Sequence, residues 1–175
     1  MITLAIDPGS QRTGFSLLRL YSSKPQYITS GSILLDSKLS FSDRLRDLYQ
    51  DLQHLCEKYR PDHLAVEKVF FAKNAQSALK LGQVRGVILL MAAQFQLEIH
   101  EYSATQVKSS ICGSGRAQKA QIEHMIRLLL KLPSSFQFSS SDQSDALAIG
   151  LTHLQSWQPT RRVLNDRTAS RRSRF

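Results

Sequence analysis

The chain has 175 residues, 42% of them hydrophobic and 21% charged, which is typical of a folded globular protein and argues against general disorder. Its formal net charge of +9 favours a polyanionic partner, either nucleic acid or an acidic membrane surface. The last 17 residues, 159–175, hold six arginines and one aspartate, which gives them a net charge of +5. The remaining +4 lies on residues 1–158, so the body of the chain is basic as well. We expect one domain over residues 1–157 and a basic, disordered tail over residues 158–175.

Several protein classes are disfavoured. The longest apolar run, residues 86–93, is far shorter than the roughly 20 residues that cross a bilayer, and the N-terminus lacks the basic segment of a signal peptide. Cys56 and Cys112 form no CxxC pair, which suits a reduced, cytoplasmic location without membrane attachment. The histidines are far apart in sequence, so we expect neither a histidine cluster nor a zinc site. They are His54, His63, His100, His124 and His153.

Hydrophobic periodicity predicts three strands at the beginning of the chain, over residues 2–6, 13–20 and 26–35. Short polar turns separate them, so they should form consecutive hairpins. Apolar residues then recur at helical spacing over residues 41–59, with Ser40 available as the N-cap.

The rest of the chain alternates between strands and helices. The predicted strands are 63–71 and 97–102, and the predicted helices are 74–95, 104–110, 117–130 and 142–157. This order favours an α/β fold with a mixed five-stranded sheet, in which three antiparallel strands are followed by parallel strands and helices cover both faces. In such sheets, functional residues gather at the carboxyl ends of the strands.

Four acids occupy positions that suit a shared site. Asp7 ends the first strand, Glu67 interrupts the apolar run of the fourth, and Asp142 and Asp145 lie three residues apart at the start of the last helix. If strands one and four are neighbours and the last helix crosses them, these carboxylates converge. Their mutual repulsion then requires cations, and oxygen ligands without His or Cys suit Mg²⁺. Two such ions about 4 Å apart can activate water and stabilise the leaving oxygen of a phosphodiester.

Each acid also has a structural explanation. Asp7 can serve the Pro-Gly turn that follows it, and Glu67 can pair with a basic neighbour at a sheet edge. Asp142 and Asp145 can complement the dipole of their helix. From the residues alone, binding modules and nucleotide-binding folds with a strand-end acid therefore remain open beside metal-dependent phosphoryl chemistry.

Longer motifs narrow the choice. The stretches "AIDPGSQRTGFSLL", "AVEKVFFAKNAQSALKLGQVRG", "EYSATQVKSSICGSGRAQKAQIEHMIRLLLKLP" and "SDQSDALAIGLTH" lie in the order in which they occur in the bacterial RuvC family of Holliday-junction resolvases. The chain resembles that family from residue 4 to residue 153. The resemblance implies a ribonuclease H-like fold in which Asp7, Glu67, Asp142 and Asp145 are the catalytic carboxylates. They would bind two Mg²⁺ ions, for which Mn²⁺ can substitute.

The resemblance also implies partners and products. A homodimer would nick two opposed strands of a four-way DNA junction by metal-dependent hydrolysis, leaving 5′-phosphate and 3′-hydroxyl ends. A branch-migration helicase complex would be a further partner in recombination and repair.

Five further residues match family positions that contact DNA. Phe70 would stack on a base at the junction centre, although an aromatic residue at a strand end is usually part of the core. Lys73 and Asn74 open a helix whose N-terminus can bind phosphate, or they are simply solvated there. Lys108 and Lys119 would lie close to the scissile phosphate, where their charge can offset developing negative charge, or they are ordinary surface lysines.

Three rival functions give different expectations. Another ribonuclease H-like nuclease, such as one that trims ribosomal RNA precursors, should lack the block from residue 70 to residue 85. A non-catalytic junction-binding protein would bind four-way DNA with or without metal and never cut it. A sugar-kinase-like or actin-like ATP binder needs two lobes and a second phosphate loop, for which this chain is too short.

Overall fold

Five strands form one mixed sheet in the computed structural model, which describes residues 1–68 and 75–157. The strands are β1 (Ile2–Asp7), β2 (Arg12–Tyr21), β3 (Lys24–Leu34), β4 (His63–Glu67) and β5 (Glu98–Tyr102). Their order across the sheet is β3-β2-β1-β4-β5. The hairpin-linked β1, β2 and β3 pair antiparallel, whereas β4 joins β1 and β5 joins β4 in parallel. The predicted strand order and directions are confirmed.

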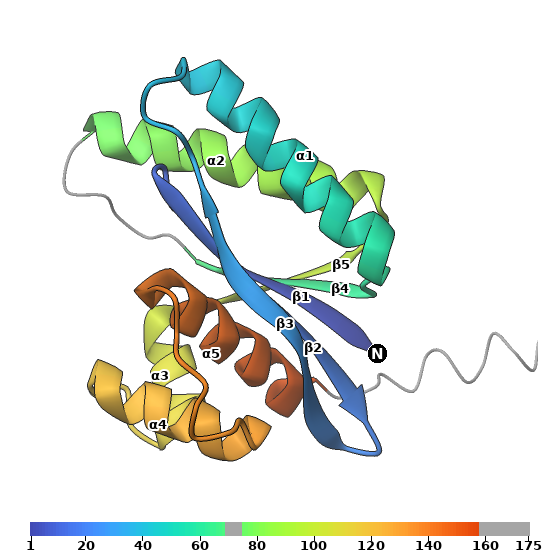
Figure 1. The fold of residues 1–175 in the computed structure, drawn as a ribbon, viewed down its shortest axis with the longest axis vertical. Coiled ribbons are helices and arrows are strands. Elements are labelled where there is room, and N and C mark those ends of the chain that lie inside the picture. The colour runs from blue at the N-terminus through green and yellow to red at the C-terminus, as the bar shows by residue number, and fades with distance from the viewer. Residues whose placement is uncertain (69–74, 158–175) are drawn as a thin grey trace, which may run out of the picture.

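Helices cover both faces of this sheet (Figure 1). They are α1 (Phe41–Tyr59), α2 (Ala75–Gln94), α3 (Ala104–Cys112), α4 (Lys119–Leu130) and α5 (Ser141–Ser156). Helices α1 and α2 lie together on one side, and α5 lies against the other side with α3 and α4 beyond it (Figure 1). Within residues 1–68 and 75–157, every helix is too short or too polar to cross a membrane.

The sheet separates two hydrophobic cores, as the alternation of side chains along β1 requires. Leu4 and Ile6 join the core under α1 and α2, whereas Ala5 belongs to the core under α5. The residue facing α5 is small, and α5 presents Gly150 at this point. A Cβ atom on Gly150 would lie 3.2 Å from that of Ala5, so the helix packs unusually close to the sheet.

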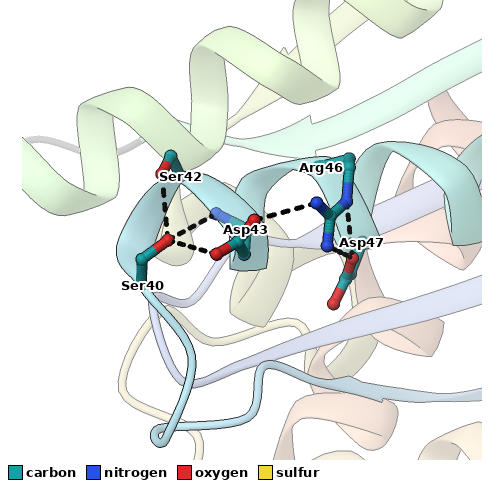
Figure 2. Close-up of polar contacts among 5 residues, drawn as sticks. All are labelled: Ser40, Ser42, Asp43, Arg46 and Asp47. Atoms are coloured by element: carbon teal, nitrogen blue, oxygen red, sulfur yellow. Dashed lines mark hydrogen bonds and ion pairs between the residues drawn. The ribbon is translucent and has the colours of Figure 1, made fainter.

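Helix α1 begins where its sequence predicts, because Ser40 caps it (Figure 2). The Ser40 hydroxyl accepts a hydrogen bond from the backbone N–H of Asp43 at 3.1 Å. The Asp43 carboxylate accepts one from Arg46 at 2.8 Å, and Arg46 also pairs with Asp47. The Ser40 cap thus provides a hydrogen-bond acceptor for a backbone N–H in the first turn of α1. Helix α1 lies on the opposite side of the sheet from α5 (Figure 1).

One strand boundary differs from its prediction. Strand β4 ends at Glu67 rather than continuing to Phe71, because its last paired residue is Glu67, opposite Tyr102 of β5. The apolar pattern that predicted the longer strand continues into residues 69–74, which lie outside the described residues together with the predicted tail, 158–175.

Candidate active site

Two of the four acids emerge at the same edge of the sheet. Strands β1 and β4 are parallel neighbours, paired from Thr3 with His63 to Ile6 with Val66. The next residue in each strand is Asp7 and Glu67. The expectation that these strands are adjacent is therefore confirmed, and it places both carboxylates at the carboxyl ends of neighbouring strands.

The start of α5 is brought to this edge by close packing on β2. A Cβ atom on Gly14, the residue that pairs with Asp7, would lie 2.0 Å from the carbonyl oxygen of Asp142. Only a glycine leaves room for the helix backbone here. One turn further on, the Ser16 hydroxyl donates a buried hydrogen bond of 2.8 Å to the carbonyl of Ala146. These contacts fix the first turns of α5 relative to Asp7.

The N-terminal turn of α5 is also held from its own side. The Ser140 hydroxyl accepts a hydrogen bond from the backbone N–H of Gln143 at 3.2 Å. The buried Gln143 side chain in turn donates to the Ser30 hydroxyl of β3 at 2.8 Å. Asp142 and Asp145 therefore sit on a turn that is attached to the sheet on both sides of them.

Asp7, Glu67 and Asp145 line one cavity of about 350 Å³, which Lys108 and Lys119 also line. Asp142 lines a neighbouring cavity with the turn at residues 9–12. Three of the predicted acids thus share a cavity, and Asp142 is not among its lining residues but lies close enough for its charge to raise the pKa of Asp7. A larger cavity of about 800 Å³ beside α4 has no carboxylate among its lining residues, so size alone does not mark this site.

The carboxylates strongly perturb one another. Burial, and then the charges of Glu67, Asp145 and Asp142, raise the pKa of Asp7 to about 8. Burial and the charge of Asp145 also raise the pKa of Glu67. Burial raises the pKa of Asp145, although Lys119 opposes this rise. The cluster consists of oxygen donors with too little positive charge to balance it, which is the environment that a hard divalent cation stabilises.

Both predicted lysines within the described residues lie at the site. The Nζ atom of Lys119 is 3.3 Å from Oδ2 of Asp145. Lys108 lowers the pKa of Glu67 through its charge, in opposition to burial. The other three predicted DNA contacts, Phe70, Lys73 and Asn74, lie outside the described residues.

One residue that the sequence reasoning missed holds the end of β4. Arg85 of α2 donates a 2.8 Å hydrogen bond from Nη1 to the carbonyl oxygen of Glu67 and forms an ion pair with Glu101. It therefore fixes the backbone of a site residue from the opposite face of the sheet. Its place in the long motif ending at residue 86 was visible in the sequence, but no local pattern identified its partner.

The expectation that the histidines form no cluster was wrong. His63, His100 and His153 each place one ring nitrogen within 4.8 Å of the others. They are distant in sequence, but the parallel pairing of β4 with β5 and the packing of α5 bring them together.

Comparison with known proteins agrees with this geometry. The family model for the crossover junction endodeoxyribonuclease RuvC matches residues 3–153. The chain is 44% identical to the RuvC of Citrifermentans bemidjiense over 156 residues, which is 89% of this chain and 93% of that protein. It is 43% identical to the RuvC of Shewanella amazonensis over 157 residues, covering 90% and 88% of the two chains.

A solved structure supports the same assignment. The chain matches Thermus thermophilus RuvC in complex with a Holliday junction substrate, with a TM-score of 0.80 and 27% identity over 87% of this chain and 92% of that one. This match confirms the ribonuclease H-like architecture. The chain belongs to the RuvC family of crossover junction endodeoxyribonucleases, the Holliday junction resolvases.

Proposed function

We propose that this chain resolves four-way DNA junctions with Asp7, Glu67, Asp142 and Asp145 as its catalytic, metal-binding residues. The observation that carries the proposal is the convergence of Asp7, Glu67 and Asp145 on one cavity, where burial and then the neighbouring charges raise the pKa of Asp7 to about 8. Clustered carboxylates repel one another and do not stabilise the folded chain, so their presence here favours a role in binding cations.

The donor set fits Mg²⁺. All four side chains offer carboxylate oxygens, and no His or Cys is among the residues that line this cavity. Two Mg²⁺ ions held here, or Mn²⁺ in their place, would activate water and stabilise the leaving oxygen of a phosphodiester. In-line attack of that water would leave the 5′-phosphate and 3′-hydroxyl ends expected from the resemblance.

The two lysines would act on the phosphate itself. Lys119 reaches Asp145 and Lys108 lies close enough to affect Glu67, so both ammonium groups border the space where a phosphate would meet the carboxylates. Their charge would offset the negative charge that develops on the phosphate oxygens in the transition state. The resemblance adds Phe70, Lys73 and Asn74 as further DNA contacts.

The proposal extends to assembly and location. The Thermus thermophilus complex supports a Holliday junction as the substrate. A homodimer would place two sites on opposed strands, and the exposed Leu79 and Leu90 of α2 offer apolar surface for such a contact. The branch-migration helicase partner and the cytoplasmic location stay in the proposal; the free thiols of Cys56 and Cys112 suit the latter.

The test is cleavage of labelled synthetic four-way junctions with several core sequences, in Mg²⁺ and separately in Mn²⁺. A linear duplex with the same arm sequence serves as the substrate control. Asp7→Asn is the site variant, and Asp47→Asn is its matched control, because Asp47 is an exposed carboxylate on α1, which lies on the opposite side of the sheet from α5 (Figure 1).

We expect paired, ligatable nicks at the junction from the wild type and from Asp47→Asn, and none from Asp7→Asn. Binding of every junction without cutting, in both metals, would instead favour the non-catalytic junction-binding protein. Equal cutting of the linear duplex would show a nuclease without selectivity for junctions.

A further inference from the structure

The three clustered histidines come from three elements at the end of the sheet opposite the carboxylates. His63 begins β4, His100 lies within β5, and His153 lies in the last turn of α5. Glu67 ends the strand that His63 begins, so these two residues are roughly 13 Å apart along β4, while His100 lies opposite Ala65, between them. None of the three histidines is among the residues that line the cavity of the carboxylates.

The imidazoles are in direct contact. Nδ1 of His63 is 2.8 Å from Nε2 of His153, and the rings of His100 and His153 have centroids 4.4 Å apart. One ring nitrogen from each histidine lies within 4.8 Å of the other two. Small side-chain rotations would bring all three to the roughly 2.0–2.1 Å that Zn²⁺ requires of histidine nitrogens.

His100 has a buried nitrogen without a hydrogen bond. Its Nε2 finds no hydrogen-bond partner among the described residues, although Oε1 of Glu98 is only 3.1 Å away. A buried ring nitrogen in this state costs free energy unless something coordinates it. The unpaired Nε2 of His100 is an observation that does not depend on the clustering of the three rings.

Two of the histidines have a polar neighbour at the ring nitrogen that points away from the cluster, as metal-bound histidines generally do. The Tyr102 hydroxyl is 2.8 Å from Nδ1 of His153, so the other nitrogen of that ring, Nε2, is the one that faces the cluster. Oε2 of Glu98 is 3.8 Å from Nε2 of His63. If His63 carries its proton on Nε2, towards Glu98, its Nδ1 and the Nε2 of His153 both offer lone pairs, and a bound metal ion would replace the hydrogen bond between them.

We propose that His63, His100 and His153 form a second metal site, selective for a borderline transition-metal ion such as Zn²⁺, with water in the remaining position. Three imidazole ligands favour Zn²⁺ over Mg²⁺. This inference does not depend on the catalytic assignment of the carboxylates.

The protonation states of the cluster suit metal binding. Burial lowers the pKa of His153 to about 3, and burial also lowers the pKa of His63. Both rings are therefore neutral at pH 7, as ligands must be, and neither has to release a proton to bind the ion.

A bound ion would join β4, β5 and the last turn of α5. Helix α5 carries Asp142 and Asp145 at its other end, so the site would hold that helix against the sheet. Metal binding would then stabilise the folded chain without taking part in cleavage.

The experiment is a Zn²⁺ titration against a chromophoric chelator, in excess Mg²⁺, on the Asp7→Asn protein, in which binding at the carboxylates is weakened. His100→Gln in that background removes one ligand, and His124→Gln is the matched control, because His124 is an exposed histidine outside the cluster. Far-UV circular dichroism checks that each variant is folded. Replacing Zn²⁺ with Co²⁺ gives a second readout, since tetrahedral Co²⁺ has intense visible absorption.

We expect one tight Zn²⁺ per chain in the Asp7→Asn protein and in His124→Gln, and binding weaker by about 100-fold or more in His100→Gln. Zn²⁺ should also raise the unfolding temperature of the first two proteins only. Absence of tight binding, or equal binding in His100→Gln, would overturn the proposal. Should His100→Gln not fold, an octahedral Co²⁺ spectrum in the Asp7→Asn protein would overturn it as well.

Discussion

Replacing Asp7 with asparagine should stabilise the metal-free protein while abolishing cleavage. Asparagine keeps the size of the side chain and can still donate a hydrogen bond to Glu67, but it removes one charge from the cluster. Because burial and then the neighbouring carboxylates raise the pKa of Asp7 to about 8, its ionised form is the unfavourable one in the folded state.

The magnitude follows from the difference between the folded and unfolded states. The pKa of Asp7 rises from an ordinary 3.8 to about 8 on folding. One pKa unit corresponds to about 1.4 kcal/mol, so the raised pKa of Asp7 lowers the unfolding free energy by on the order of 4 kcal/mol at pH 7. Since the charges are coupled and the cluster can relax, we expect Asp7→Asn to recover on the order of 2–4 kcal/mol.

The pH dependence has a definite sign. The folded state binds the Asp7 proton more tightly than the unfolded chain, so the stability of the wild type should fall as pH rises from about 4 to about 8. Urea unfolding in EDTA across this range measures the fall, which Asp7→Asn should largely lack. Mg²⁺ at a hundredfold excess over its dissociation constant should restore about 2.7 kcal/mol to the wild type and much less to the variant.

The control is Asp47→Asn, which should change stability by less than about 0.5 kcal/mol at every pH because Asp47 is an exposed carboxylate. If Asp7→Asn is no more stable than the wild type at pH 8 in EDTA, the cluster is not under the electrostatic stress described above. A cation bound at these carboxylates would then have no repulsion to relieve.

Three further outcomes are expected. Gly14→Ala should reduce junction cleavage at least about tenfold and lower the unfolding free energy by about 1–3 kcal/mol, because the new methyl group would collide with the Asp142 carbonyl. Lys119→Met should slow cleavage by about 10- to 100-fold in single-turnover assays while leaving junction affinity nearly unchanged, because it removes the ammonium group beside Asp145. Cys56 should resist alkylation at pH 8 in mass-spectrometric labelling of the native protein, because burial raises the pKa of its thiol to about 12.

Each of these has a matched control in the same chain. Gly86→Ala adds a methyl group to open space on α2 and should not lower the unfolding free energy. Lys58→Met removes an exposed lysine from the last turn of α1, on the opposite side of the sheet from α5 (Figure 1), and should leave the cleavage rate unchanged. Cys112 is only half-buried and should be labelled first. A Gly14→Ala protein as stable and active as the wild type, or cleavage slowed equally by both lysine variants, would contradict the packing and charge arguments.

The sequence predicted the sheet well because its signals are local. The alternation of apolar and polar residues, the turn residues and the helical spacing of apolar residues predict every described strand and helix. The proximity of Asp7 and Glu67 follows from their strand-end positions because β1 and β4 are neighbours. The end of β4 was misplaced because the apolar run outlasts the strand. Hydrophobicity reports burial, whereas the strand ends where its pairing with β5 ends.

The parts that could not be predicted depend on contacts between distant segments. The histidine cluster depends on the register of β4 against β5 and on the position at which α5 packs against these strands. Neither can be predicted from a short stretch of sequence. The same holds for Arg85, whose partner is a backbone carbonyl of β4. Gly14 looked like an ordinary strand residue, and its role appears only once the backbone of α5 is seen against it.

The burial of α5 has a consequence for how the site behaves between turnovers. Eleven of its 16 residues are buried, including nearly all of those beyond Asp145. Such a helix loses its hydrogen bonds only when most of the domain unfolds, whereas exposed loops open locally at little cost. Asp142 and Asp145 thus belong to a helix that is among the segments least prone to local unfolding. Asp142 and Asp145 therefore keep their spacing while substrate comes and goes.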